Sequence, residues 1–236
     1  MRALEPAVSI HLWELGADQL PVQRCVTMLA EARGARPEVI ARLPLGVRDA
    51  GLLELWERWY GADIPCVDVC PFCSETLEFT VCASDLRATA RGPDDQDAEP
   101  RVVGRLLLRS LTSEDVLAVG LGARAEERLA RRALVQVDGS PWAGSLDQEL
   151  YLELEAALAH MDPLAEILLD LACAACGRPW RALFDIGEHL WHAVSRDALE
   201  ALYAVDALAR AYGWDEARIL GLSPRRRRTY LDLVGA

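Results

Sequence analysis

Lysine is absent from this chain of 236 residues, so all 25 of its basic residues are arginines. Aspartate and glutamate outnumber them at 37, which leaves a formal net charge of −12 at pH 7. Nucleic-acid binding depends largely on the neutralisation of phosphates by basic side chains. The charge balance therefore argues against a nucleic-acid partner.

Long apolar runs are also missing. Hydrophobic residues make up 52% of the chain, yet charges interrupt every Leu/Ala-rich segment before it reaches the roughly 18 residues that a membrane span needs. The N-terminal stretch MRALEPAVSIHLWELG carries Glu5 and Glu14 on either side of its short apolar run and has no small-residue cleavage site. We therefore expect no membrane span and a cytoplasmic, reducing location.

The usual catalytic motifs are absent as well. The chain has no G-x-S-x-G, P-loop or G-x-G-x-x-G pattern, and its only four histidines form no H-E-x-x-H motif. His189 and His192 can share one face of a helix, but no carboxylate pattern accompanies them. The sequence predicts that the protein is not an enzyme.

Seven cysteines stand out against these absences, and four of them form two C-x-x-C pairs. Cys70 and Cys73 lie in CPFCSETLEF, and Cys173 and Cys176 lie in CAACGRPWRALF. In both segments a tight turn leads into a strand-like stretch, as in a zinc ribbon, where four thiolates hold Zn²⁺ in a closed tetrahedral site. We expect a structural zinc site formed by these four cysteines, with iron as the other metal that thiolates favour.

Two alternatives to this metal site remain open. The pairs are separated by 99 residues, far more than the roughly 15 to 20 of a compact zinc site, although loop-closure entropy grows only slowly with length. Both pairs could instead sit in turns without a metal, or one could be a thiol redox centre, which favours a helix N-terminus. Cys25 is predicted to pack in a helix, and Cys66 and Cys82 to pack in the core or, less favourably, to serve as spare ligands.

Hydrophobic periodicity predicts a mostly helical α+β fold. A helix of about 27 residues should begin at Ile186 and end at Gly213, and a strand is expected at 101–109 after a polar loop at 88–100. Ser113 should begin a helix with acidic residues in its first turn. Further helices are predicted at residues 19–33, 37–43, 48–61, 124–136, 146–160, 215–222 and from Pro224 onwards.

These elements divide the chain into five predicted regions. A small zinc-ribbon-like β unit is split by a long helical insertion, and a C-terminal helical bundle follows. The regions are an N-terminal helical region at 1–62, the first knuckle with β segments at 63–112, the insertion at 113–170, the second knuckle at 171–185 and the C-terminal helices at 186–236.

A run of four arginines, Arg225, Arg226, Arg227 and Arg228, interrupts the acidic character of the chain near its C-terminus. We expect this run, with Tyr212 and Trp214, to form a surface for a protein partner. It could instead be the solvated face of a helix whose buried side carries Tyr230. A helix-turn-helix that reads DNA is disfavoured by the net charge.

Several segments together resemble a family of bacterial proteins encoded with phage-tail-like contractile injection systems, which are similar to baseplate hub assembly proteins of T-even phages. The resemblance spans nearly the whole chain and is most specific in YGWDEARILGLSPRRR and in the two knuckles. At the first knuckle, Ser74 stands where a glycine is expected. The other segments are LWELGADQLPVQRCVTMLA, LPLGVRDAGLLELWERWYG and RSLTSEDVLAV.

This resemblance implies a non-enzymatic structural or assembly factor, acting as a chaperone or adaptor with other baseplate, hub or spike proteins. Such a protein would work in the cytoplasm or become part of the assembled particle. Two other functions remain open, a zinc-ribbon regulator associated with nucleic acid and, less favoured, a thiol oxidoreductase.

Overall fold

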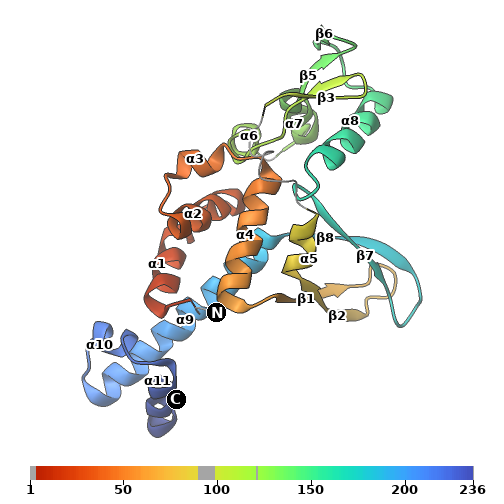
Figure 1. Ribbon diagram of the computed structural model, residues 1–236. Helices are drawn as coiled ribbons and strands as arrows, with labels where there is room; N and C mark the ends of the chain where they lie inside the picture. Colours follow the sequence, from red (N-terminus) through yellow and green to blue (C-terminus); the bar gives the residue numbers. More distant parts are fainter. Residues whose placement is uncertain (1–3, 90–98, 121, 236) are drawn as a thin grey trace.

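The computed structural model describes residues 4–89, 99–120 and 122–235 (Figure 1). The chain is 56% helical and 18% strand, and its strands form small antiparallel sheets. The predicted mostly helical α+β class is therefore confirmed. Most of the predicted loop at 88–100 lies outside the described residues.

Five helices build the main core, which buries residues such as Leu29, Leu52 and Leu190 completely. They are α1 (Pro6–Gly16), α2 (Pro21–Arg33), α3 (Pro37–Ala41), α4 (Leu45–Tyr60) and the long α9 (Ile186–Tyr212).

Local sequence signals set the ends of these helices. Proline is the first residue of α1, α2 and α3, where its missing N–H costs no hydrogen bond. Gly34 and Gly213 end α2 and α9 with φ of +60° and +66°. The predicted bounds of the long helix are confirmed, whereas α1 is not among the predicted helices. Gly16 in α1 lies so close to Trp191 of α9 that a Cβ there would be 2.4 Å from the indole ring.

Two β-hairpins pack against the helical core. The first consists of β1 (Asp63–Val69) and β2 (Thr76–Cys82), and the second of β7 (Ile167–Ala172) and β8 (Pro179–Phe184). Each C-x-x-C segment is the turn of one hairpin. The strand-like stretches predicted after the two knuckles are present, and β1 and β7 are additional strands that precede them. A short helix, α5 (Ala83–Ala88), follows the first hairpin, and α9 follows the second.

Between the hairpins lies an insertion with its own hydrophobic cluster, in which Leu106, Leu108 and Leu154 are buried. Its four short strands pair in the order β3-β4-β5-β6. The elements are β3 (Arg101–Val103), β4 (Leu106–Leu108), α6 (Ser113–Val119), α7 (Ala125–Ala133), β5 (Leu134–Val137), β6 (Ser140–Pro141) and α8 (Gln148–Met161).

Two predicted elements between the hairpins, the strand at 101–109 and the helix at 124–136, are wrong in detail. The single strand at 101–109 is a hairpin, because Gly104 turns the chain with φ of +58° between β3 and β4. The helix predicted at 124–136 ends at Ala133, and Leu134 begins a strand that pairs with β4. The insertion is therefore helical and β-sheet in character rather than purely helical.

Buried charges hold the insertion together and link it to the core. The Asp115 network lies within the insertion, and Arg48 makes the link to the core. Asp115 in α6 accepts hydrogen bonds from Arg109 at 2.7 and 2.8 Å and from Arg132 at 2.9 Å. Arg48 of α4 reaches Ser113 at 2.9 Å and is paired with Asp49 at 2.7 Å.

The chain ends in two short helices that pack on the C-terminal part of α9 through Leu208, Ile219 and Leu222. They are α10 (Glu216–Leu220) and α11 (Pro224–Val234), and the latter begins after Ser223, whose Oγ accepts a hydrogen bond from the N–H of Arg226.

Candidate metal centre

The two C-x-x-C turns have the same backbone geometry. In the first, the N–H of Ser74 donates to the carbonyl of Cys70 at 2.9 Å and the N–H of Cys70 donates to Glu75 at 2.9 Å. In the second, the N–H of Gly177 donates to the carbonyl of Cys173 at 2.9 Å, and the N–H of Cys173 donates to the carbonyl of Arg178 at 3.1 Å.

The residue after the second cysteine has positive φ in both turns, +63° at Ser74 and +70° at Gly177. The turn therefore requires a left-handed residue. Ser74 adopts that conformation although glycine suits it better.

The similarity extends beyond the turns. Helix α5 begins 13 residues after Cys70, and α9 begins 13 residues after Cys173. Each half of the site is thus a strand, a C-x-x-C turn, a second strand and a helix with matched spacing. This repeat places the two knuckles in equivalent positions and explains why they can meet face to face.

The sulfur atoms of Cys70, Cys73, Cys173 and Cys176 all lie within 4.8 Å of one another. Across the two hairpins, Cys70 Sγ lies 3.7 Å from Cys176 Sγ, and Cys73 Sγ lies 3.6 Å from Cys173 Sγ. Four thiolates about 2.3 Å from a tetrahedral zinc ion have sulfurs about 3.8 Å apart. The four predicted ligands are therefore brought together, and the donor set fits a metal ion.

Burial differs within each pair in the same way. Cys70 and Cys173, the first cysteines, are buried, whereas Cys73 and Cys176 are exposed. The backbone N–H groups of Cys176 and Ala175 lower the pKa of Cys173 to about 7. The backbone N–H of Glu75 lowers the pKa of Cys73, but hydrogen bonds with the thiols of Cys173, Cys70 and Cys176 raise it to about 12. Hydrogen bonding within the cluster thus favours the thiolate at Cys173, the form that binds metals, and the thiol at Cys73.

Further contacts join the two hairpins beside the sulfurs. The indole N–H of Trp180 donates to Asp68 at 3.2 Å, and the Arg178 guanidinium lies 5.1 Å from the centre of the Phe72 ring. These contacts join the hairpins at a second point beside the sulfur cluster.

The other cysteines lie apart from the cluster. Cys25 is buried between α2 and α9, and loss of hydration raises its pKa to about 12. Cys66 is also buried, with its sulfur 3.6 Å from His189 Nε2, and burial raises its pKa. Cys82 lies at the end of β2, 3.0 Å from the Ser84 hydroxyl. In the described part of the chain, neither Cys66 nor Cys82 belongs to the group that could hold a metal.

The predicted partner-binding residues lie at the end of α9 and on α11. Tyr212 stacks on Trp214 with ring centres 4.7 Å apart, and Tyr230 closes the cluster 4.9 Å from Trp214. Arg218, which the sequence pattern does not single out, lies over the Trp214 ring at 4.5 Å.

The four arginines of the run are not equivalent. Arg225, Arg226 and Arg228 are exposed. Arg227 is half-buried, with Nη2 donating to the Leu222 carbonyl at 3.2 Å, and burial lowers its pKa. Arg227 therefore helps to hold α11 in place, and the other three are available to a partner.

No protein-family model, curated protein or solved structure matches the chain. The likeness to contractile-system proteins therefore stays a prediction. Among the residues that the structure describes, no helix is both long and apolar enough to cross a membrane.

Proposed function

We propose that this chain is a non-enzymatic structural or assembly factor of a phage-tail-like contractile injection system, with a structural Zn²⁺ held by Cys70, Cys73, Cys173 and Cys176. The observation that carries the proposal is the cluster of four sulfurs from two hairpins at opposite ends of the insertion. The particular system is supported by the resemblance of the sequence segments.

A bound zinc ion would join the hairpins without catalysing a reaction, because four thiolates leave no open coordination position. An isolated two-stranded hairpin is only marginally stable. Metal-binding free energy would therefore contribute to folding at this position. Zinc is preferred over iron because a structural role needs no redox chemistry.

The proposed partner surface consists of Tyr212, Trp214 and the arginine run from Arg225 to Arg228, in which Arg227 holds α11 in place and the other three are exposed. It combines an aromatic cluster with exposed guanidinium groups, and both residue types are enriched where proteins bind one another. The proposed partners are other baseplate, hub or spike proteins.

The metal part of the proposal is tested by elemental analysis of the purified protein. We expect one zinc per chain, and loss of zinc in the double variant Cys73→Ser/Cys176→Ser. Cys82→Ser is the matched control, because Cys82 lies in the same hairpin outside the sulfur cluster, and it should retain zinc. One iron per chain instead of zinc would show that the structural metal is iron. A wild-type protein without metal would refute the metal part of the proposal.

The assembly part is tested by expressing the tagged chain together with sheath, hub and spike proteins of a contractile injection system. The wild type should co-purify with at least one of them, and Arg225→Glu/Arg226→Glu/Arg228→Glu should not. Salt-dependent DNA binding in place of co-purification would favour a nucleic-acid regulator. Insulin reduction that disappears in Cys70→Ser or Cys173→Ser would favour a thiol oxidoreductase.

A further inference from the structure

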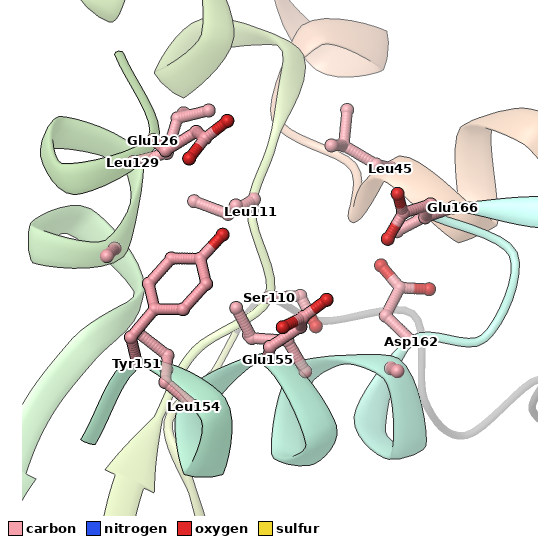
Figure 2. A pocket seen from close by; sticks show the side chains of 14 residues that line it. Leu45, Ser110, Leu111, Glu126, Leu129, Tyr151, Leu154, Glu155, Asp162 and Glu166 are labelled. Atoms are coloured by element: carbon pink, nitrogen blue, oxygen red, sulfur yellow. The ribbon is translucent and has the colours of Figure 1, made fainter. Parts of the chain in front are cut away.

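A cavity of about 350 Å³ lies where the insertion meets the helical core (Figure 2). Its size is within the range of sites that hold small molecules or a few side chains. Residues from α4, α7, α8 and two connecting segments line it, and most of them are apolar. The large apolar ones are Leu45, Leu111, Leu129, Leu154 and Leu158.

Every charged side chain in the lining is acidic. Figure 2 shows Glu126 on one side of the cavity and Asp162 and Glu166 on the other, with Glu155 on α8. Asp162 accepts a hydrogen bond from the N–H of Gly46 at 3.1 Å. Within the described residues, Glu155 and Glu166 have no arginine at ion-pair distance. An apolar wall bordered by the exposed carboxylates of Glu126, Glu155 and Glu166 fits an occupant that is both apolar and cationic.

An arginine side chain has this character. Its methylene stem packs on apolar surface, and its planar guanidinium donates to carboxylates. A neighbouring aliphatic side chain would fill the remaining apolar space. The occupant should therefore carry an arginine and an aliphatic residue on the same face.

The chain itself has such a face on α11. Arg225 and Arg226 are exposed and have no carboxylate partner among the described residues. Leu233 is 70% exposed and lies seven residues after Arg226, which is two helical turns further along the same face. Helix α11 lies at the opposite end of the molecule from α7 and α8 (Figure 1). An α11 that fills the cavity would therefore belong to another copy of the chain.

We propose that the face of α11 formed by Arg225, Arg226 and Leu233 docks into the cavity of a second copy. The proposal deepens the partner-binding role proposed for α11 and rests on it, but requires neither the metal nor a contractile particle. Helix and cavity are different surfaces, so the contact between two copies is heterologous. One copy then still has an unoccupied cavity and the other an undocked α11, and each can bind a further copy. Association continues past the dimer unless a ring closes.

Sedimentation velocity of the full chain at low salt tests this proposal. With increasing concentration, the wild type should form species heavier than twice the 26.0 kDa chain, and added salt should reverse this. Glu155→Arg/Glu166→Arg and Arg225→Glu/Arg226→Glu should each weaken association at least about tenfold, because each lost charge-assisted contact is worth about 1.5 kcal/mol or more.

Mixing the two reversed variants gives the sharpest result. One retains an intact α11 and the other an intact cavity, so an equimolar mixture should form a heterodimer although each variant alone is monomeric. Glu149→Arg, elsewhere on α8, and Arg36→Glu, before α3, are single charge-reversal controls, and both should associate like the wild type. If the reversed cavity variant fails to fold by circular dichroism, Glu155→Gln/Glu166→Gln replaces it.

The proposal is overturned if the wild type stays monomeric at all concentrations, or if the mixture forms no heterodimer. A monomer whose melting temperature rises with L-arginine amide, but not in the cavity variant, would assign the cavity to a different cationic ligand. Loss of sheath or spike co-purification in the arginine variant alongside a monomeric wild type would leave the proposed function intact and reject only this inference.

Discussion

Asp115 should make the stability of the insertion sensitive to acid. Burial alone would raise the pKa of this carboxyl, but hydrogen bonds from Arg109 and Thr112 outweigh burial and lower the pKa from 3.8 to about 2. Each pKa unit corresponds to about 1.4 kcal/mol. The Asp115 side chain is only 5% exposed, whereas Arg109 and Arg132 are 25% and 42% exposed, so solvent screens part of this energy. We assign about 2 kcal/mol of stability to the ionised form.

The lowered pKa fixes the direction of the pH dependence. A carboxyl whose pKa is lower in the folded state stabilises the fold fully above its unfolded value, near 4, and loses that contribution as pH falls towards 2. Asp115→Asn should therefore be about 2 kcal/mol less stable than the wild type at pH 7. The difference should shrink between pH 4 and pH 2.

Urea unfolding at a series of pH values, followed by circular dichroism, measures this difference. Loss of thiolate-bound metal in acid affects both proteins equally and cancels. The adjacent Glu114→Gln is the control, because its ion pair with Arg42 is exposed and should be worth less than about 1 kcal/mol. Equal destabilisation by the two variants, or a difference for Asp115→Asn that is constant down to pH 2, would refute the reasoning.

Three further predictions concern the knuckles and the core. Ser74→Gly should stabilise the protein by up to about 1 kcal/mol, seen as a higher melting temperature, because glycine adopts the left-handed backbone conformation of this position without strain. Gly177→Ala should destabilise it by a similar amount. Gly16→Ala should cost about 1 to 3 kcal/mol in urea unfolding, because the new methyl group would overlap the Trp191 ring; an unchanged midpoint would contradict the packing of α1 on α9. Removal of the proposed metal by a chelator should abolish amide-exchange protection in 63–82 and 167–184 while α9 keeps its protection. Simultaneous loss in all three segments would show that the hairpins do not open separately.

The sequence predicts best where a local signal repeats or ends sharply. Periodic apolar residues and Gly213 define the long helix, and the two C-x-x-C pairs identify the four cysteines that the fold brings together. The missed strands β1 and β7 have weaker signals. Asp63–Val69 contains Pro65, and Ile167–Ala172 is a short apolar run that periodicity cannot distinguish from a helix.

Other features depend on contacts between distant segments. Leu134 leaves the predicted helix because β4 offers it a strand partner, which no local pattern reveals. The cavity combines residues from 45 to 166, so its acidic lining emerges only in three dimensions. The matched 13-residue spacing from Cys70 and Cys173 to the following helices is the one signal in the sequence that could have indicated the paired hairpins.

The sulfur cluster has two cysteines that solvent reaches and two that it does not. Reagents arriving from solvent would meet Cys73 and Cys176 first, one from each hairpin, and modification of either would remove a ligand without disturbing its buried neighbour. Alkylation should therefore proceed in two stages, with Cys70 and Cys173 reacting only after the outer pair has been lost. The order in which the four thiols react with an alkylating reagent would therefore show in what order the two hairpins lose their contact at the sulfur cluster.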